Sequence, residues 1–273
     1  MQILIPVLIL LGIGVLCALL LTVSAIFFAV KEDERAVQIR ECLPGANCGA
    51  CGFSGCDGYA KALSEGKISE TNLCVPGGDG TSREIAAILG VEAADVVEKV
   101  AYVRCNGSSC TPDKKKYEYS GPKTCKAVSM SYNGDNLCPY ACLGYGDCVK
   151  VCPRDAICID DTGIATIDPR KCIGCGVCVK ECPNSVIGLI NDTTRVVVVC
   201  NSHEKGAAVR KACKNGCIAC GKCEKVCPHG AIKVIDNLAT IDYEKCTGCG
   251  ACKAACPVGC IHEGNFICGA HFE

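Results

Sequence analysis

The residues best suited to do chemistry in this chain are cysteines, grouped in blocks between Cys138 and Cys256. The clearest block, residues 172–183, has the spacing C-x2-C-x2-C-x3-C and ends in a proline. This spacing is typical of a [4Fe–4S] cluster, because three thiolates lie along one tight loop and a fourth follows a turn later. Glycines between the cysteines let the backbone amides of the loop approach the cluster.

Two more blocks, residues 217–228 and 246–257, repeat this pattern in full. A fourth block, residues 142–153, is imperfect. In a two-cluster domain, the proline turns the chain so that the fourth thiolate of each block reaches the other cluster. The crossing predicts four ligand sets: Cys172, Cys175 and Cys178 with Cys152; Cys138, Cys142 and Cys148 with Cys182; Cys217, Cys220 and Cys223 with Cys256; and Cys246, Cys249 and Cys252 with Cys227.

The imperfect block has Tyr145 where the middle cysteine belongs. We expect Cys138, four residues before Cys142, to replace the missing ligand. A three-iron cluster and an empty site are the alternatives. Zinc also binds paired cysteines, but it rarely uses four in so tight a run followed by proline.

A separate four-thiolate set comes earlier in the chain, in a glycine-rich loop that favours another iron–sulfur cluster over a structural zinc ion. It consists of Cys48, Cys51, Cys56 and Cys74. Residues 57–65 after it predict a short helix that stops at Gly66. A second helix is expected over residues 81–89, with Thr81 or Ser82 as its N-cap.

The segment between these regions carries further cysteines and a run of lysines. Cys105, Cys110 and Cys125, with Cys200 or Cys213 as a fourth ligand, could hold one additional cluster, or they could be free structural thiols. Lys114, Lys115 and Lys116 form a basic stretch. It is either a solvated linker or a docking patch for an acidic protein partner. Five cysteines have no assignment: Cys17, Cys42, Cys158, Cys260 and Cys268.

Composition narrows the class of protein. The chain has 273 residues, 30 cysteines, no tryptophan and a net charge of −1. So many cysteines indicate either a disulfide-rich secreted protein or a metalloprotein of a reducing compartment, and the cluster spacing favours the metalloprotein. The near-neutral charge gives no indication of nucleic-acid binding. With few large side chains, metal binding must supply much of the folding free energy.

The N-terminal segment has no charged side chain from Ile3 to Val30. A helix of this length would exceed a hydrocarbon core of roughly 30 Å, which predicts one transmembrane helix in the cell membrane. A secretory signal fits poorly, because no basic region precedes the apolar run. Lys31, Arg35 and Arg40 follow it, so the positive-inside rule predicts that the soluble part lies on the cytoplasmic side.

These features predict an α+β protein made of small iron–sulfur domains behind one transmembrane helix. The expected divisions are an anchor over 1–30, an N-terminal [4Fe–4S] domain over 31–90, a connecting segment over 91–135 and two tandem cluster modules over 136–192 and 193–273. The modules are an internal duplication, each with a hairpin, expected over 156–167 and 231–241. Residues 195–200 predict a buried strand that links them. Residues 92–100 could form a helix or lead into a strand over 100–103.

The order of these parts resembles the B-subunit family of Rnf complexes, membrane-bound ferredoxin:NAD oxidoreductases that pump Na+ or H+. The resemblance rests on residues 47–56 (NCGACGFSGC), 104–107 (RCNG) and 144–153 (GYGDCVKVCP), and it covers nearly the whole chain. It implies a subunit that accepts electrons from reduced ferredoxin and passes them to membrane partners. Flavins and the NAD site would then lie on other subunits.

No other catalytic pattern is present: we find no phosphate-binding loop, no nucleophile elbow and no dinucleotide fingerprint after a strand. The sequence therefore predicts five [4Fe–4S] clusters, with a sixth conceivable, that form an electron pathway without a substrate pocket. Two other functions compete with this prediction. One is a polyferredoxin anchor of a membrane hydrogenase or formate dehydrogenase, and the other is a zinc-binding structural or interaction protein.

Overall fold

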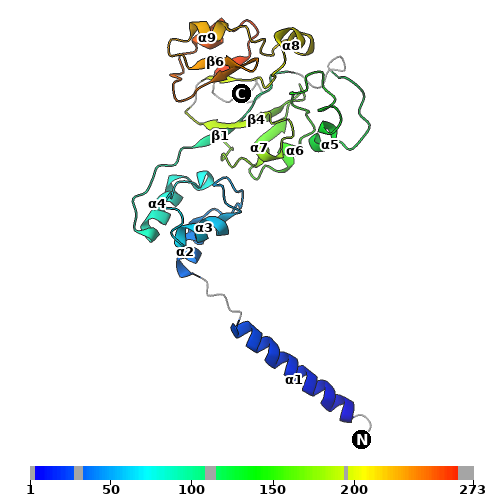
Figure 1. Cartoon of the computed structure of the whole chain (residues 1–273), viewed down its shortest axis with the longest axis vertical. Coiled ribbons are helices and arrows are strands. Elements are labelled where there is room, and N and C mark those ends of the chain that lie inside the picture. The colour runs from blue at the N-terminus through cyan, green and yellow to red at the C-terminus, as the bar shows by residue number, and fades with distance from the viewer. Residues whose placement is uncertain (1–3, 28–32, 108–114, 194–195, 264–273) are drawn as a thin grey trace.

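The computed structural model describes residues 4–27, 33–107, 115–193 and 196–263. Three parts follow one another in Figure 1: a long helix at the N-terminus, a small helical domain, and a larger body of short helices and two-stranded ribbons. Cys110, Lys114 and Cys268 lie outside the described residues.

Helix α1, Leu4–Phe27, is 24 residues long and stands apart from the rest of the described chain (Figure 1). Its side chains are described without interruption only over residues 10–24, and these are exposed and almost all apolar. Among the residues that the structure describes, no helix meets the length and apolarity needed to cross a membrane.

The N-terminal domain packs α2 (Glu34–Cys42), α3 (Cys56–Ser64) and α4 (Gly78–Leu89) around Ile39, Tyr59 and Ile85, with the short 3-10 helix Val75–Gly77 between α3 and α4. Helix α3 matches the predicted one to within a residue and stops before Gly66. Helix α4 begins before the predicted N-cap. Thr81 Oγ1 donates to the Cys42 carbonyl and Ser82 Oγ to the Ala94 carbonyl, so both hydroxyls join segments instead of capping the helix.

The larger body contains two ferredoxin-like modules. Both predicted hairpins are present: β2 (Ile157–Ile159) pairs with β3 (Ala165–Ile167), and β6 (Ile232–Ile235) pairs with β7 (Leu238–Ile241). The other helices of this body are short: α5 (Cys125–Ser129), α6 (Asp147–Lys150), α7 (Val177–Glu181), α8 (Gly206–Ala212), α9 (Lys222–Val226) and α10 (Ala251–Ala255).

Each module has a second two-stranded ribbon, in which the first strand of the module pairs with its last strand. In the first module, β1 (Lys99–Val103) pairs antiparallel with β4 (Ile187–Asn191). In the second, β5 (Val196–Val198) pairs with β8 (Ile261–Glu263). Residues 92–98 form no regular element, so the strand alternative is the correct one for the end of that segment. The buried strand predicted near 195–200 is β5, although Arg195 lies outside the described residues.

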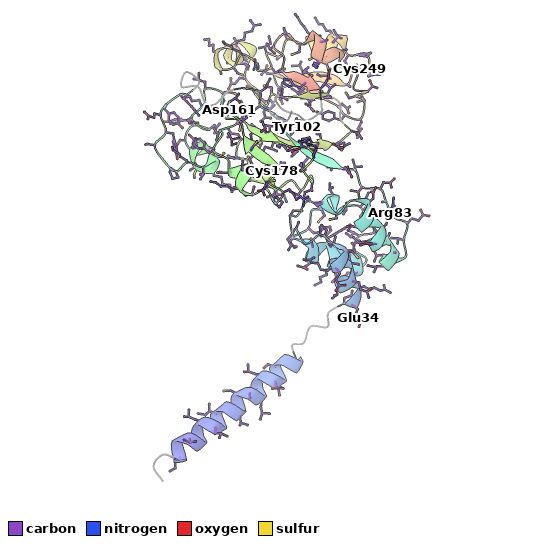
Figure 2. All side chains as sticks on the ribbon, turned by 180° about the vertical axis from the view of Figure 1, so that it is seen from behind. Glu34, Arg83, Tyr102, Asp161, Cys178 and Cys249 are labelled. Carbon is purple, nitrogen blue, oxygen red and sulfur yellow. The ribbon has the colours of Figure 1, made fainter. Side chains whose placement is uncertain are left out.

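The two modules pack against each other through these closing ribbons. Val100 and Ile190 of the first module form one apolar cluster with Val197 and Val199, which belong to β5 and the residue after it. Tyr102 on β1 lies against Tyr243 of the second module, and the two phenols share a hydrogen bond. Figure 2 places Tyr102 between Cys178 of one module and Cys249 of the other. The contact is therefore a small hydrophobic core, not a flexible linker.

Candidate iron–sulfur sites

Each complete cysteine block forms the same loop: two cysteines precede a very short helix, the third lies within the helix and the fourth follows it. The residue before each of these helices has a left-handed backbone: Gly176, φ +70°, before α7, and Gly250, φ +75°, before α10. L residues with a Cβ rarely adopt this conformation, so glycine allows the chain to wrap closely around a ligand. Pro183 and Pro257 follow the fourth cysteine of these blocks.

Three of the expected thiol sets line small cavities. Cys152 lies with Cys172, Cys175 and Cys178; Cys227 with Cys246, Cys249 and Cys252; and Cys256 with Cys217, Cys220 and Cys223. In each set the fourth cysteine comes from the other block of the module, as the crossing predicts. Cys260 also lines the third cavity, where its sulfur lies 3.6 Å from that of Cys256.

The sulfurs of these sets receive backbone hydrogen bonds. The Ala101 amide donates to Cys172 Sγ at 3.5 Å, the Ala156 amide to Cys152 Sγ at 3.3 Å and the Ala231 amide to Cys227 Sγ at 3.3 Å. The last two contacts occupy equivalent positions in the two modules. Amide donors stabilise negative charge on sulfur, which is one way that a protein sets the potential of an iron–sulfur cluster.

The imperfect block keeps the loop but changes a ligand. Gly144 and Gly146 have φ of +78° and +77°, like the glycines of the complete blocks, so Tyr145 stands in the place of a middle cysteine. Its hydroxyl donates to Asp135 Oδ2 at 2.9 Å. Burial and this hydrogen bond to a carboxylate raise the pKa of Tyr145 to about 12, so the phenol stays protonated at neutral pH.

Cys125 takes the position that we expected Cys138 to fill. The cavity at this block is lined by the thiols of Cys125, Cys142, Cys148 and Cys182. The Thr124 hydroxyl caps α5 by accepting from the Ala127 amide at 3.2 Å, and Asp147 Oδ2 accepts from the Lys126 amide at 3.1 Å. These two contacts hold the start of α5 against α6, and with it the Cys125 side chain.

Cys138 lies elsewhere, in a larger cavity at the junction of the two modules. Cys105, Cys200 and Cys213 line the same cavity. The structure thus separates Cys125 from the other described cysteines of the additional set that the sequence suggested.

The N-terminal set is also drawn together. Cys56 and Cys74 are buried in the core of this domain and Cys51 packs against it, while the Asn47 side chain accepts from the Cys56 amide at 2.9 Å. Burial, and to a smaller extent the neighbouring thiols of Cys56, Cys51 and Cys48, raise the pKa of the Cys74 thiol to about 11.

This domain touches the first module at its cluster-binding loops. Lys180 Nζ on α7 donates to the Gly49 carbonyl at 3.2 Å, and the Cys48 carbonyl lies 3.5 Å away. Cys48 also acts electrostatically on Cys175, since it helps to raise the pKa of that thiol after the main effect of burial. The loops of two candidate sites therefore face each other.

The donor sets fit iron–sulfur clusters. Each small cavity is lined by at least four thiols from two or three segments, and thiolates are the usual ligands of these clusters. No three His, Cys, Asp or Glu side chains in the described part of the chain lie close enough to share a single metal ion. In a [4Fe–4S] cluster each thiolate binds a different iron, so the four need not converge on one point.

Two of the cysteines without an assignment, Cys42 and Cys158, contact protein groups. Cys42 Sγ donates to the Gln38 carbonyl at 3.4 Å, and Cys158 Sγ lies 3.0 Å from Thr166 Oγ1. The basic stretch is partly tied into the first module. Lys115 Nζ pairs with Asp135 Oδ2 at 2.9 Å, and Lys116 Nζ donates to the Tyr132 carbonyl at 3.1 Å.

Comparison with known proteins identifies the family. Residues 43–76 match the family described as "Putative Fe-S cluster", residues 165–188 a "4Fe-4S binding domain" and residues 216–260 a "4Fe-4S dicluster domain". The chain is 42% identical over 243 residues to the B subunit of the Na(+)-translocating ferredoxin:NAD(+) oxidoreductase complex of Acetobacterium woodii, covering 89% of this chain and 72% of the relative.

Two further relatives agree. The B subunit of the proton-translocating ferredoxin:NAD(+) oxidoreductase complex of Clostridium ljungdahlii is 44% identical over 230 residues, which cover 84% of this chain and 81% of the relative. The B subunit of the ion-translocating oxidoreductase complex of Methanosarcina acetivorans is 39% identical over 236 residues, with coverage of 86% and 88%. This chain belongs to the B-subunit family of ion-translocating oxidoreductase complexes. The predicted resemblance to Rnf B subunits is confirmed.

Proposed function

We propose that this chain is the electron-transfer subunit of an ion-translocating ferredoxin:NAD oxidoreductase complex, and that it takes electrons from reduced ferredoxin and passes them to membrane partners. The observation that carries the proposal is the grouping of four thiols around each ferredoxin-type cavity in a member of this family. When bound at such sites, [4Fe–4S] clusters take up and release one electron at a time. NAD reduction and Na+ or H+ translocation belong to the whole complex.

Five sets of thiolates would hold the clusters. Four follow the sequence prediction: the N-terminal set, the set of Cys172, and the two sets of the second module. In the fifth, Cys125 replaces Cys138 beside Cys142, Cys148 and Cys182. The amides that donate to Cys152, Cys172 and Cys227 favour negative charge on these sulfurs.

The contact between Lys180 and the 48–49 loop supports an electron route between the N-terminal domain and the first module. We propose that residues 1–30 anchor the chain in the cell membrane by a single span, with the iron–sulfur domains on the cytoplasmic side. The apolar run before Lys31 and the lysine and arginines after it support this orientation. The N-terminal domain would then be the part nearest the membrane.

Ferredoxin is the proposed soluble partner, and Lys114, Lys115 and Lys116 remain the candidate docking residues. Within this group, Lys115 pairs with the buried carboxylate of Asp135. Lys116 is exposed, and in the described part of the chain its ammonium donates only to backbone carbonyls, which do not neutralise its charge. Lys116 is therefore better placed to meet an acidic partner.

The test is metal and sulfide analysis of the full chain purified without oxygen, combined with EPR during reduction by ferredoxin. Five clusters predict about 20 iron and about 20 acid-labile sulfide per chain. Zinc without sulfide would contradict iron–sulfur binding and favour a structural protein. Clusters that reduced ferredoxin cannot reduce would contradict the proposed place in the complex.

A further inference from the structure

A cavity of about 690 Å³ lies where the two ferredoxin-like modules meet, and its walls come from both. Four thiols line it, Cys105 and Cys138 from the first half of the body and Cys200 and Cys213 from the second. We propose that these four cysteines hold a sixth [4Fe–4S] cluster, which joins the two modules.

Distances and electrostatics show that the thiols are close together. A Cβ placed on Gly107 would lie 3.6 Å from Cys213 Sγ and 3.9 Å from Cys105 Sγ, so these sulfurs are no farther apart than the sum of the two distances. Cys138 lines the same cavity as Cys200 and Cys213, and both of these thiols act on it electrostatically. Segments that are distant in sequence thus bring their thiols to one place.

Two of the four sulfurs are hydrogen-bonded like those of the ferredoxin-type sets. The Cys142 amide donates to Cys105 Sγ at 3.4 Å, and the Cys217 amide donates to Cys200 Sγ at 3.3 Å. The amides on Cys152 and Cys172 make the same kind of contact. A thiolate bound to iron carries negative charge, which such amides stabilise.

Free structural cysteines are the simpler explanation, because buried thiols often act as small apolar side chains. Such thiols would be expected to fill space, since protein interiors are packed with few voids larger than a water molecule. Here the four thiols instead line one common cavity that is far larger than one water, together with other residues of both modules. The backbone of Gly107 lies against both Cys105 and Cys213. This geometry fits an occupant that the thiols hold in common.

The position of the site indicates its role, and this step rests on the proposed function. The amides that bind Cys105 and Cys200 belong to Cys142 and Cys217, which are proposed ligands in the first and second module. One hydrogen bond therefore connects the junction site to a ligand set on each side. With clusters bound, the four junction cysteines would hold the group that accepts one electron from a reduced cluster of one module, which would thereby be oxidised.

The test compares Cys213→Ser with the matched control Cys158→Ser in the full chain, purified without oxygen. Cys158 lies in the first module and lines no thiol cavity in the described part of the chain. Cys213→Ser should lose about four iron and four sulfide relative to the control, with the EPR signals of the other clusters retained. Iron and sulfide equal to the control would overturn the proposal, and so would the loss of one zinc ion without sulfide.

A double variant tests whether the thiols share one cluster. Cys105→Ser alone should lose about four iron, and Cys105→Ser/Cys213→Ser should lose the same four, whereas separate sites would make the losses add. If the serine variants fail to fold, the iron content of the wild-type chain provides the test. About 24 iron per chain supports the sixth cluster, and about 20 contradicts it. A count of about 20 leaves the proposed function intact, whereas a chain without iron and sulfide refutes both proposals.

Discussion

The two ferredoxin-like modules share one architecture and differ in one ligand. In both modules the first strand pairs with the last strand, and a hairpin lies between the two cysteine blocks. The second module finds all its proposed thiolates within its two blocks, whereas the first has Tyr145 in one loop and takes Cys125 from outside the block. The loop conformation thus survives the loss of a ligand, because glycines rather than the middle cysteine set its backbone.

The first module compensates for the missing cysteine in its loop with a thiol from another segment. Tyr145 is turned to Asp135, which Lys115 also contacts, so the side chain that replaced a cysteine belongs to a small polar network. The segment that bears Cys125 is held by Thr124 and Asp147. A thiol on a separate helix can therefore serve the same cavity as a thiol within the loop.

The largest effect is expected from Cys125→Ser. If Cys125 is the fourth ligand, this variant should lose about four iron and four sulfide, because the fourth iron loses its thiolate and the cluster becomes labile. Iron and sulfide quantification with EPR measures the loss against Cys158→Ser. Conversion to a three-iron signal would also show that Cys125 binds the cluster, and an unchanged cluster content would show that it does not.

The double variant Cys125→Ser/Tyr145→Cys should regain what the single variant loses. Tyr145 occupies the position of Cys175 in the complete block, so a cysteine there restores the regular spacing. We expect the iron content to return to the wild-type value, about four iron above Cys125→Ser. A double variant that stays as depleted as the single one would mean that the loops are not equivalent.

A smaller effect is expected at the contact between modules. Tyr102→Phe removes one phenol of the pair with Tyr243 and leaves the other without its partner, which should cost about 1–3 kcal/mol. The midpoint of thermal cluster loss, followed by absorbance, should fall relative to Tyr119→Phe, a tyrosine outside the described module contact. Equal midpoints would show that the hydrogen bond contributes nothing to the contact.

The smallest effect is expected from Lys116→Glu. Reversal of this exposed charge should slow reduction by ferredoxin several-fold at low salt and hardly at all at high salt, because screening removes surface electrostatics. Lys115→Glu is unsuitable, since it would place a second carboxylate beside Asp135. Stopped-flow reduction rates over a salt series provide the measurement, with Lys233→Glu of the second module as a control. Rates that do not depend on Lys116 would reject this docking site.

The sequence predicted most accurately what depends on local spacing. The cysteine pattern and its proline predicted three thiol sets that the structure contains: two in the second module and one around Cys172. Both hairpins were predicted because two short strand-like segments flank turn residues. Family membership was also evident from short cysteine strings. These signals are contained in a few consecutive residues.

What the sequence did not predict depends on contacts between distant segments. Cys125 lies in a five-residue helix whose position is fixed by Asp147, and no spacing rule connects it to Cys142. Cys138 was preferred only because it is nearer in sequence. The pairing of β1 with β4, and the gathering of Cys105 and Cys138 with Cys200 and Cys213, likewise require the folded chain.

The strand pairings set an order for biogenesis. Because a ribosome delivers the chain from its N-terminus, β1 can meet β4 while the second module is still unmade. The second module must wait for β8, close to the C-terminal end of the described residues. The first module can therefore mature early, but the junction thiols Cys105 and Cys138 stay without Cys200 and Cys213 until later synthesis. In the growing chain, the junction site therefore stays incomplete for longer than the cavities within the first module.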